Sequence, residues 1–101
     1  MINKLKSILG LGPKVNTREL IANGAIIVDV RTKGEYAGGH VKGSLNIPLD
    51  QLQHNLKKFK DKNKIIITCC ASGMRSSSAK SFLKAQGFTN VHNGGSWHNL
   101  K

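Results

Sequence analysis

The sequence has few acidic residues, few aromatic residues and only two cysteines in 101 residues. The cysteines, Cys69 and Cys70, are adjacent and cannot join distant parts of the chain, which excludes a small secreted fold held by disulfides. No run of about 18 apolar residues occurs, so no transmembrane helix is expected. Aromatic residues make up 5%, too few for the stacking surfaces that bind single-stranded nucleic acid.

The charge of the chain is strongly one-sided. There are 16 Lys and Arg against 5 Asp and Glu, and the resulting net charge of +11 attracts anions in general. Because the basic residues are scattered, we predict a small anionic substrate as the partner and no nucleic acid. The 4 histidines are dispersed without a repeated Cys–His spacing, so neither a metal site nor a cofactor is predicted.

Residues 1–14 form a short basic amphipathic segment at the N-terminus. Lys4 and Lys6 interrupt its apolar residues, so the segment does not have the pattern of a signal peptide and is expected to stay in the mature protein. Its apolar residues fall on one helical face, which predicts a strap packed on the domain. The alternative is a weak contact with a membrane surface, without stable insertion.

Strand and helix patterns alternate after residue 14. Apolar runs predict parallel strands, over residues 25–30, 43–49, 64–68 and 88–92. Capping and stop signals predict helices, from Thr17 to Asn23, after Thr32, over 50–59 and from Ser76 to Gln86. The alternation predicts an α/β domain with a largely parallel sheet and helices on both faces. In such folds ligands bind beyond the carboxyl ends of the strands.

The stretch "CASGMRS", residues 70–76, lies between a predicted buried strand and a predicted helix. Its small residues let the backbone curl tightly, and Gly73 can adopt a positive φ, so successive N–H groups would point inward as an anion-binding nest. The positive end of the following helix adds to this field. A cysteine at the start of the loop would have a stabilised thiolate, a lowered pKa and the reactivity of a nucleophile.

Either cysteine fits a nucleophile pattern. Five residues separate Cys69 from Arg75, which is the spacing of cysteine-dependent phosphatases, and four separate Cys70 from Arg75. In those phosphatases a glycine falls third after the nucleophile and a histidine precedes it. Here the glycine falls third after Cys70, and Thr68 precedes Cys69. Cys69 also ends the predicted strand, where a cysteine is a small buried apolar residue, and Cys70 is therefore favoured.

The loop "CASGMRS" resembles the active-site loop of single-domain rhodaneses, which are sulfurtransferases. Residues 28–49, "VDVRTKGEYAGGHVKGSLNIPL", resemble the other signature of the rhodanese-like family. The resemblance covers residues 15–101 and implies one rhodanese domain over that range. It also implies a three-layer α/β fold with a largely parallel five-stranded sheet and helices on both faces.

The resemblance implies that Cys70 is the catalytic residue. Its thiolate would take the outer sulfur of an anionic donor such as thiosulfate or a persulfide, and sulfite would leave thiosulfate. A thiol, cyanide or a protein acceptor would then take the sulfur from the Cys70 persulfide. Arg75 would bind the sulfonate of the donor or brace the loop, and Met74 would lie at the mouth of the site. The substrate-binding loop would comprise Ala71, Ser72, Gly73, Met74 and Arg75.

Other residues are predicted to support the site. Asp29 and Arg31 are expected to pair with each other or with loop backbone, and Glu35 is a predicted partner of Arg31. His40 is expected to bind backbone in a turn. Cys69 is predicted to be inert, with the alternative that it resolves the persulfide or forms a strained disulfide with Cys70. Further matches to the family are Ser76, Gly94, Gly95 and Trp97, of which Ser76 is predicted to support the loop and Trp97 to pack at the core or its edge.

The sequence thus predicts a cytoplasmic sulfurtransferase that acts through Cys70; it favours a monomer but leaves the oligomeric state open. One alternative is a phosphatase or arsenate reductase that uses Cys69, although neither Asp50 nor Asp61 has the position of a general acid. The other alternative is a non-catalytic binding module that retains only the rhodanese-like fold, although the cysteine, glycine and arginine of the loop are intact.

Overall fold

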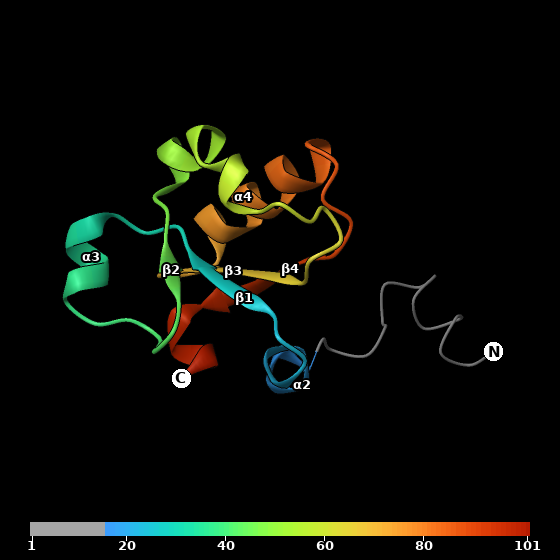
Figure 1. Cartoon of the computed structure of the whole chain (residues 1–101). Helices are drawn as coiled ribbons and strands as arrows, with labels where there is room; N and C mark the ends of the chain where they lie inside the picture. Colours follow the sequence, from blue (N-terminus) through green and yellow to red (C-terminus); the bar gives the residue numbers. More distant parts are fainter. Residues whose placement is uncertain (1–15) are drawn as a thin grey trace, which may run out of the picture.

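The computed structural model describes residues 16–101, so the segment 1–14 lies outside the described residues. Its sheet is wholly parallel, with strand order β2-β1-β3-β4 (Figure 1). The strands are β1 (Ile26–Asp29), β2 (Leu45–Asn46), β3 (Ile66–Cys70) and β4 (Val91–Ser96). The expected fifth strand was wrong: within residues 16–101 the sheet has four strands. Only four stretches of this part of the sequence have a strand pattern, and each supplies one of them.

Helices cover both faces of the sheet, as predicted (Figure 1). One face lies under α4 (Met74–Ala85) and the 3-10 helices η1 (Leu49–His54) and η2 (Leu56–Lys58). The opposite face lies against α2 (Thr17–Ala22) and η3 (Trp97–Leu100). The short helix α3 (Lys33–Ala37) projects to the side of β2.

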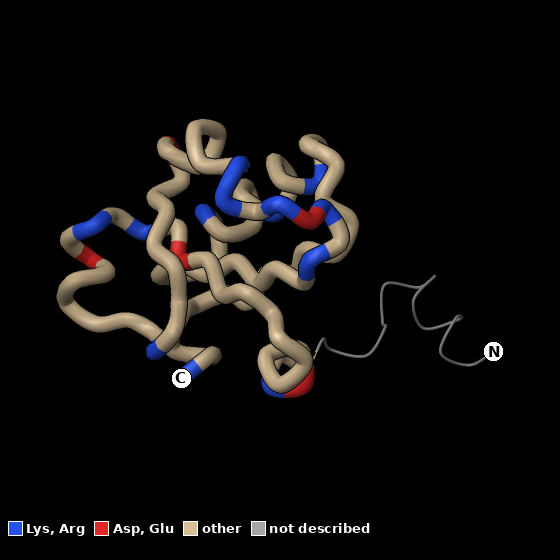
Figure 2. The backbone as a smooth tube through the Cα atoms, viewed as in Figure 1, with Lys and Arg blue, Asp and Glu red and all other residues tan. Residues whose placement is uncertain are grey.

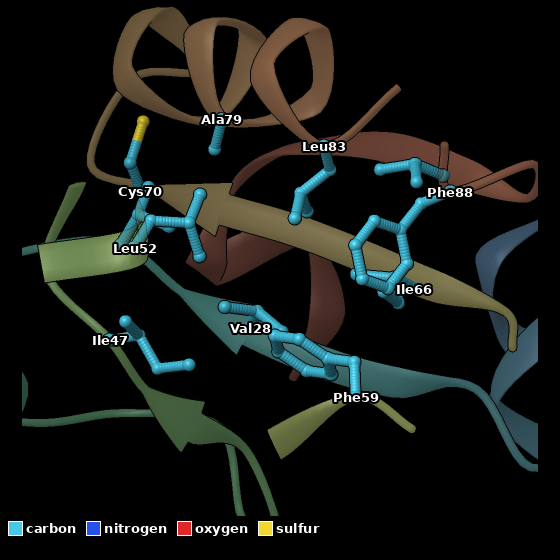
Figure 3. Close-up of a cluster of buried hydrophobic side chains, with 11 residues drawn as sticks. Val28, Ile47, Leu52, Phe59, Ile66, Cys70, Ala79, Leu83 and Phe88 are labelled. Carbon is cyan, nitrogen blue, oxygen red and sulfur yellow. The ribbon is translucent and has the colours of Figure 1, made fainter. Parts of the chain in front are cut away.

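Each face of the sheet has its own buried cluster. The larger one, between the sheet and α4, contains Val28, Ile66 and Leu83 (Figure 3). The smaller one, on the opposite face, contains Ile27 and Ile67. Neighbouring residues of β1 and β3 therefore belong to different clusters, because successive side chains of a strand point to opposite faces. This burial on both faces explains why these two strands are continuous apolar runs.

The caps of the first two helices follow the sequence pattern. The Asn16 side chain accepts a hydrogen bond from the Glu19 N–H at 3.1 Å, at the start of α2. At α3, Thr32 and Glu35 form a reciprocal capping box. Both caps satisfy backbone N–H groups that have no partner within the helix.

The α-helix predicted over residues 50–59 was wrong. This segment forms η1 and η2, which have no side-chain caps, and Asn55 with φ −121° separates them. Asparagine favours such non-helical conformations because its side chain competes for backbone hydrogen bonds, and the Asn55 Nδ2 donates to the Gln51 carbonyl oxygen at 2.7 Å. The apolar residues of this segment still face the core, since Leu52 and Phe59 are buried.

Boundaries near the carboxyl ends of the strands also differ from the prediction. β3 continues through Cys70, and α4 begins at Met74 rather than at Ser76. The last strand covers Val91–Ser96 rather than residues 88–92. Phe88 is instead a core residue whose ring meets that of Phe59 edge to face, with centroids 5.9 Å apart. Within residues 16–101, no helix has the length and apolar character needed to cross a bilayer.

Gly94 lets β4 approach β3 closely. A Cβ at this position would lie 2.8 Å from Ile67 Cγ2, 3.0 Å from Leu100 Cδ1 and 3.1 Å from the Thr68 carbonyl oxygen. The pairing of β4 with β3 also shifts register between Thr68 and Cys70. The place of the Cys70 loop next to β4 thus depends on the absence of a side chain at Gly94.

We expect Gly94→Ala to lower the free energy of unfolding by about 1–3 kcal/mol, because the added methyl group overpacks the contact between β3 and β4. Urea titration followed by circular dichroism measures the change. The control is Gly34→Ala in α3, where a Cβ meets nothing within 4 Å. This control should leave the free energy of unfolding unchanged or raise it by up to about 1 kcal/mol. Equal stability of the two variants would contradict the close packing at Gly94.

Candidate active site

The two cysteines at the end of β3 face opposite sides of the sheet. Both are fully buried. Cys69 belongs to the smaller cluster with Ile67, and Cys70 belongs to the larger cluster with Ala79. Figure 3 shows the Cys70 sulfur directed toward the first turn of α4. A single ligand therefore cannot contact both sulfurs, and a disulfide between them would require β3 to be rebuilt.

Residues 71–73 curl around the Cys70 sulfur and lead into α4. The Gly73 N–H donates a hydrogen bond to Sγ at 2.9 Å, and the Ser76 N–H donates at 3.4 Å. Gly73 has φ +102°, and its Cβ position would lie 3.4 Å from the Gly95 Cα. A residue with a side chain would be strained at this angle, so glycine is what allows the N–H to turn toward the sulfur.

The two thiols have opposite acidities. Burial alone would raise the pKa of Cys70, but hydrogen bonds from the Ser76 hydroxyl and from the backbone N–H groups of Ser76, Gly73 and Ser72 outweigh it and lower the pKa. Burial, together with the nearby charge of Asp29, raises the pKa of Cys69 to about 12. The thiolate is therefore easier to form at Cys70 than at an ordinary cysteine, whereas at neutral pH it is suppressed at Cys69.

Arg75, in the first turn of α4, forms a two-bond ion pair with Glu35 of α3. The two N–O distances are 2.7 and 2.9 Å. Hydrogen bonds from Arg75 and from the Thr32 N–H lower the pKa of Glu35 to about 2, so its carboxyl is charged at neutral pH. Glu35 was predicted to pair with Arg31, and this was wrong: the Arg31 Nη1 reaches only the Glu35 backbone carbonyl, at 3.2 Å. Next to this pair, Met74 is 79% exposed.

Asp29 and Arg31 lie on the Cys69 side of the sheet. They form a buried ion pair, with 2.7 Å between Arg31 Nη2 and Asp29 Oδ2. Arg31 also donates to the Gly39 carbonyl oxygen at 2.7 Å, and its guanidinium lies 4.5 Å from the centre of the Trp97 ring. These contacts tie the end of β1 to the loop after α3, so the pair fixes the backbone and does not face the Cys70 sulfur.

Ser76 and Asn93 complete the surroundings of Cys70. Ser76 is fully buried, and its Oγ lies 3.5 Å from the Cys70 Sγ. The Ser76 hydroxyl donates to the Asn93 Oδ1 at 2.6 Å. Sequence reasoning missed Asn93, although "NGG" contains a usable signal: Asn93 Oδ1 accepts from the Gly95 N–H, the two-residue offset of an Asx turn.

A hollow of about 390 Å³ lies beside the loop, lined on one side by Arg75. Its other walls come from the residues between β1 and α3 and from the start of η1, namely Val30, Thr32, Pro48, Leu49 and Asp50. The hollow is mainly apolar with charges at its rim, so it offers space for a molecule that approaches the loop from the Arg75 side.

His40 lies apart from the Cys70 loop in the sequence, and the structure shows what surrounds it and the other possible metal ligands. The His40 Nδ1 lies 2.8 Å from the Tyr36 carbonyl oxygen, and its ring stacks on the Tyr36 ring with centroids 3.8 Å apart. His40 is thus a turn residue bound to backbone, as expected from the sequence. Among residues 16–101, no group of three or more His, Cys, Asp or Glu is close enough to bind a metal ion.

Comparisons with known proteins find similar sequences and similar folds. The family model described as "Rhodanese-like domain" matches residues 15–99. The chain is 36% identical over 69 residues to the thiosulfate sulfurtransferase PspE of Escherichia coli (strain K12), covering 67% of this chain and 66% of that protein. It is 36% identical over 75 residues to the thiosulfate sulfurtransferase GlpE of Ectopseudomonas mendocina, covering 74% of this chain and 68% of that protein.

Two further similarities bear on the function. A solved structure titled "rhodanese with anions from E. coli" superposes with a TM-score of 0.71 at 32% identity, covering 75% of this chain and 91% of that chain. A tRNA uridine(34) hydroxylase of Buchnera aphidicola is 33% identical over 73 residues, but the match covers only 23% of that protein. The chain thus spans about two thirds of the two sulfurtransferases and about a quarter of the hydroxylase.

Iodoacetamide should alkylate the native protein at Cys70 and leave Cys69 unmodified until the chain unfolds. The pKa of Cys70 is lowered and its loop is exposed, whereas Cys69 has a pKa of about 12 and lies inside the smaller cluster. The rate should rise with pH through a pKa below the ordinary thiol value, since only the thiolate reacts. Peptide mass spectrometry assigns the site, and Cys70→Ser is the control. Comparable labelling of Cys69 in the native state would contradict this.

Proposed function

The chain belongs to the rhodanese-like domain family, and on this basis we propose that it is a sulfurtransferase that carries sulfur on Cys70. The observation that supports this most directly is the convergence of the Gly73 and Ser76 N–H groups on the Cys70 sulfur. Such donors stabilise negative charge on sulfur before and after transfer. The printed activity of PspE and GlpE is thiosulfate sulfurtransfer, and we extend that activity to this chain.

The first half of the proposed reaction loads the sulfur. The Cys70 thiolate attacks the outer sulfur of a donor such as thiosulfate, and a new S–S bond forms. The S–S bond of the donor breaks, and sulfite leaves with its electron pair. Cys70 becomes a persulfide whose negative charge lies on the outer sulfur, within the donors of residues 71–76. The total charge is the same on both sides of this step.

The second half regenerates the thiolate. A thiolate, cyanide or a protein acceptor attacks the outer sulfur of the persulfide, and the S–S bond to Cys70 breaks with its electron pair on Sγ. Cys70 is fully buried, so either reactant reaches it only after local opening of the exposed loop residues 71 and 72. The hollow next to Arg75 gives an acceptor a place from which to approach.

Charge favours an anionic donor. The net charge of +11 draws anions toward the whole molecule. The densest group of lysines is in residues 57–64, in the chain before β3, and Figure 2 shows basic positions close together there. Arg75 is the cation that the loop itself carries, and Glu35 partly neutralises it. We propose that Arg75 braces the loop through Glu35 and binds the sulfonate with its remaining N–H groups.

The two alternative functions have less support. A phosphatase that uses Cys69 would need that sulfur in the loop, whereas Cys69 lies on the other face with a pKa of about 12. A binding module without catalysis would have no need for the hydrogen-bonded Cys70 sulfur. The similarity to the hydroxylase covers only 23% of that protein, so it gives little support for a hydroxylase activity of this chain. A sulfur donor and an acceptor thus remain the proposed partners.

Incubation with thiosulfate should add one sulfur atom to the protein, detectable as a gain of about 32 Da in intact mass. The added mass should be present in Cys69→Ser, absent in Cys70→Ser, and lost from the loaded protein on addition of cyanide. If none of these forms gains mass, thiosulfate is not the donor. If only Cys69→Ser loses the adduct, the proposed nucleophile is wrong.

Glu35→Gln should lower the KM for thiosulfate by about two- to fivefold and leave kcat nearly unchanged. The substitution frees Arg75 and removes a negative charge beside the loop, while Gln can still accept the capping hydrogen bond from Thr32. The matched control is Glu19→Gln, which removes the same charge on α2. A raised KM in Glu35→Gln would mean instead that the ion pair holds Arg75 in its binding position.

A further inference from the structure

Asn93, on β4, contacts the Cys70 loop through both ends of its side-chain amide. Its Oδ1 accepts from the Ser76 hydroxyl at 2.6 Å and from the Gly95 N–H at 2.9 Å. Its Nδ2 donates to the Gly73 carbonyl oxygen at 3.2 Å. A flipped amide would set two donors against each other at Gly95 and two acceptors against each other at Gly73. These partners therefore fix which end of the amide faces Ser76.

The Ser76 hydroxyl has one hydrogen and competing acceptors. The Asn93 Oδ1 accepts from it at 2.6 Å, and the Cys70 thiol, which itself donates to the Ser76 Oγ at 3.5 Å, becomes an acceptor when it ionises. The Gly73 carbonyl oxygen, at 3.1 Å, already accepts from the Ser77 N–H. While Cys70 is a thiol, the hydrogen points to Asn93, because an amide oxygen is a far better acceptor than a thiol sulfur.

Ionisation of Cys70 changes this competition. A thiolate accepts hydrogen bonds strongly, so the charged sulfur draws the hydroxyl hydrogen away from Asn93. The bond between Ser76 and Asn93, at 2.6 Å, is then lost or weakened. When Cys70 ionises, the hydrogen bond that Asn93 accepts from Ser76 in the thiol state is therefore weakened, and this makes the thiolate less favourable.

We propose that Asn93 is a positioning residue that holds the Ser76 hydroxyl hydrogen and thereby disfavours the Cys70 thiolate relative to states with an uncharged Sγ. This deepens the proposed function and rests on Cys70 as the nucleophile. One uncharged state is the thiol. The other is the persulfide, in which Sγ is bonded to the outer sulfur and the charge lies on that outer atom. When the persulfide forms, the hydrogen returns to Asn93, so Asn93 favours the sulfur-loaded enzyme at equilibrium.

Asn93 can be changed without disturbing the core. It is exposed, whereas Ser76 is fully buried, so truncation of Asn93 leaves no cavity. The substitutions used below change no charge. The charged and titratable groups on the elements around Cys70 are Asp29, Arg31, Lys33, Glu35, Tyr36, Asp50, His54, Cys69, Arg75, Lys80, Lys84 and His92.

The test measures the pKa of Cys70 from the pH dependence of iodoacetamide alkylation in the full chain. Asn93→Ala should lower this pKa by about half a unit to one unit, because the freed hydroxyl donates to the thiolate without losing another bond. In the Ser76→Ala background the same substitution should have no effect, since there is no hydroxyl to hold. The matched control is Asn90→Ala, which removes an amide next to β4 that contacts His92 and not the loop.

Each outcome decides the proposal. A lowered pKa in Asn93→Ala that disappears in the Ser76→Ala background supports it. An unchanged or raised pKa overturns it, and a raised pKa would show that Asn93 mainly clamps the loop through Gly73. An equal decrease in both backgrounds overturns the route through Ser76. If Ser76→Ala does not fold, the sign of the shift in Asn93→Ala still decides, because this variant removes an exposed side chain.

A second measurement links the proposal to sulfur transfer. At a pH above both pKa values, Asn93→Ala should hold about three- to tenfold less persulfide relative to thiolate at a fixed ratio of thiosulfate to sulfite, because its thiolate is more stable. Intact mass gives this ratio. Alkylation needs no sulfur donor, so failure of the wild type to form a persulfide would refute the proposed function alone. An unshifted pKa in a wild type that does load sulfur would refute only the role of Asn93.

Discussion

The alternation of side chains along β3 is the constraint on which the site depends. Cys69 and Cys70 are chemically identical neighbours, yet one faces a closed apolar cluster and the other faces the start of α4. A shift of one residue in the pairing of β3 with β1 would exchange their environments. The register, with Asp29 opposite Cys69, is therefore what selects the sulfur that the loop surrounds.

Backbone N–H groups make most of the hydrogen bonds to the selected sulfur. The N–H groups of Gly73 and Ser76 converge on it because a left-handed glycine joins the strand to the helix. Backbone donors are held by the fold and need no reorganisation when charge develops. The charged side chains nearby act mainly on position: Arg75 links the loop to α3, and Arg31 links β1 to the loop before His40.

The sequence was informative about features that depend on residues close together in the chain. Continuous apolar runs located β1 and β3, the Thr32 to Glu35 spacing located the capping box, and the small residues before Arg75 located the loop. It was uninformative about contacts between residues that are far apart in the chain. The partner of Arg75 lies 40 residues away, and Asn93 lies 17 residues from Ser76, so neither contact has a periodic pattern. The number of strands was taken from a family likeness rather than from the apolar runs, and there the expectation failed.

Trp97 gives the molecule an optical label on one side. It is the single tryptophan of the sequence, and the centre of its indole ring lies 4.5 Å from the Arg31 guanidinium and 4.6 Å from the Lys101 ammonium. Neighbouring cations shift and quench indole emission, so the intrinsic fluorescence reports on the layer that holds Cys69. An unfolding curve recorded by this emission therefore follows η3 and the buried ion pair. Loosening of the Cys70 loop alone leaves the emission unchanged.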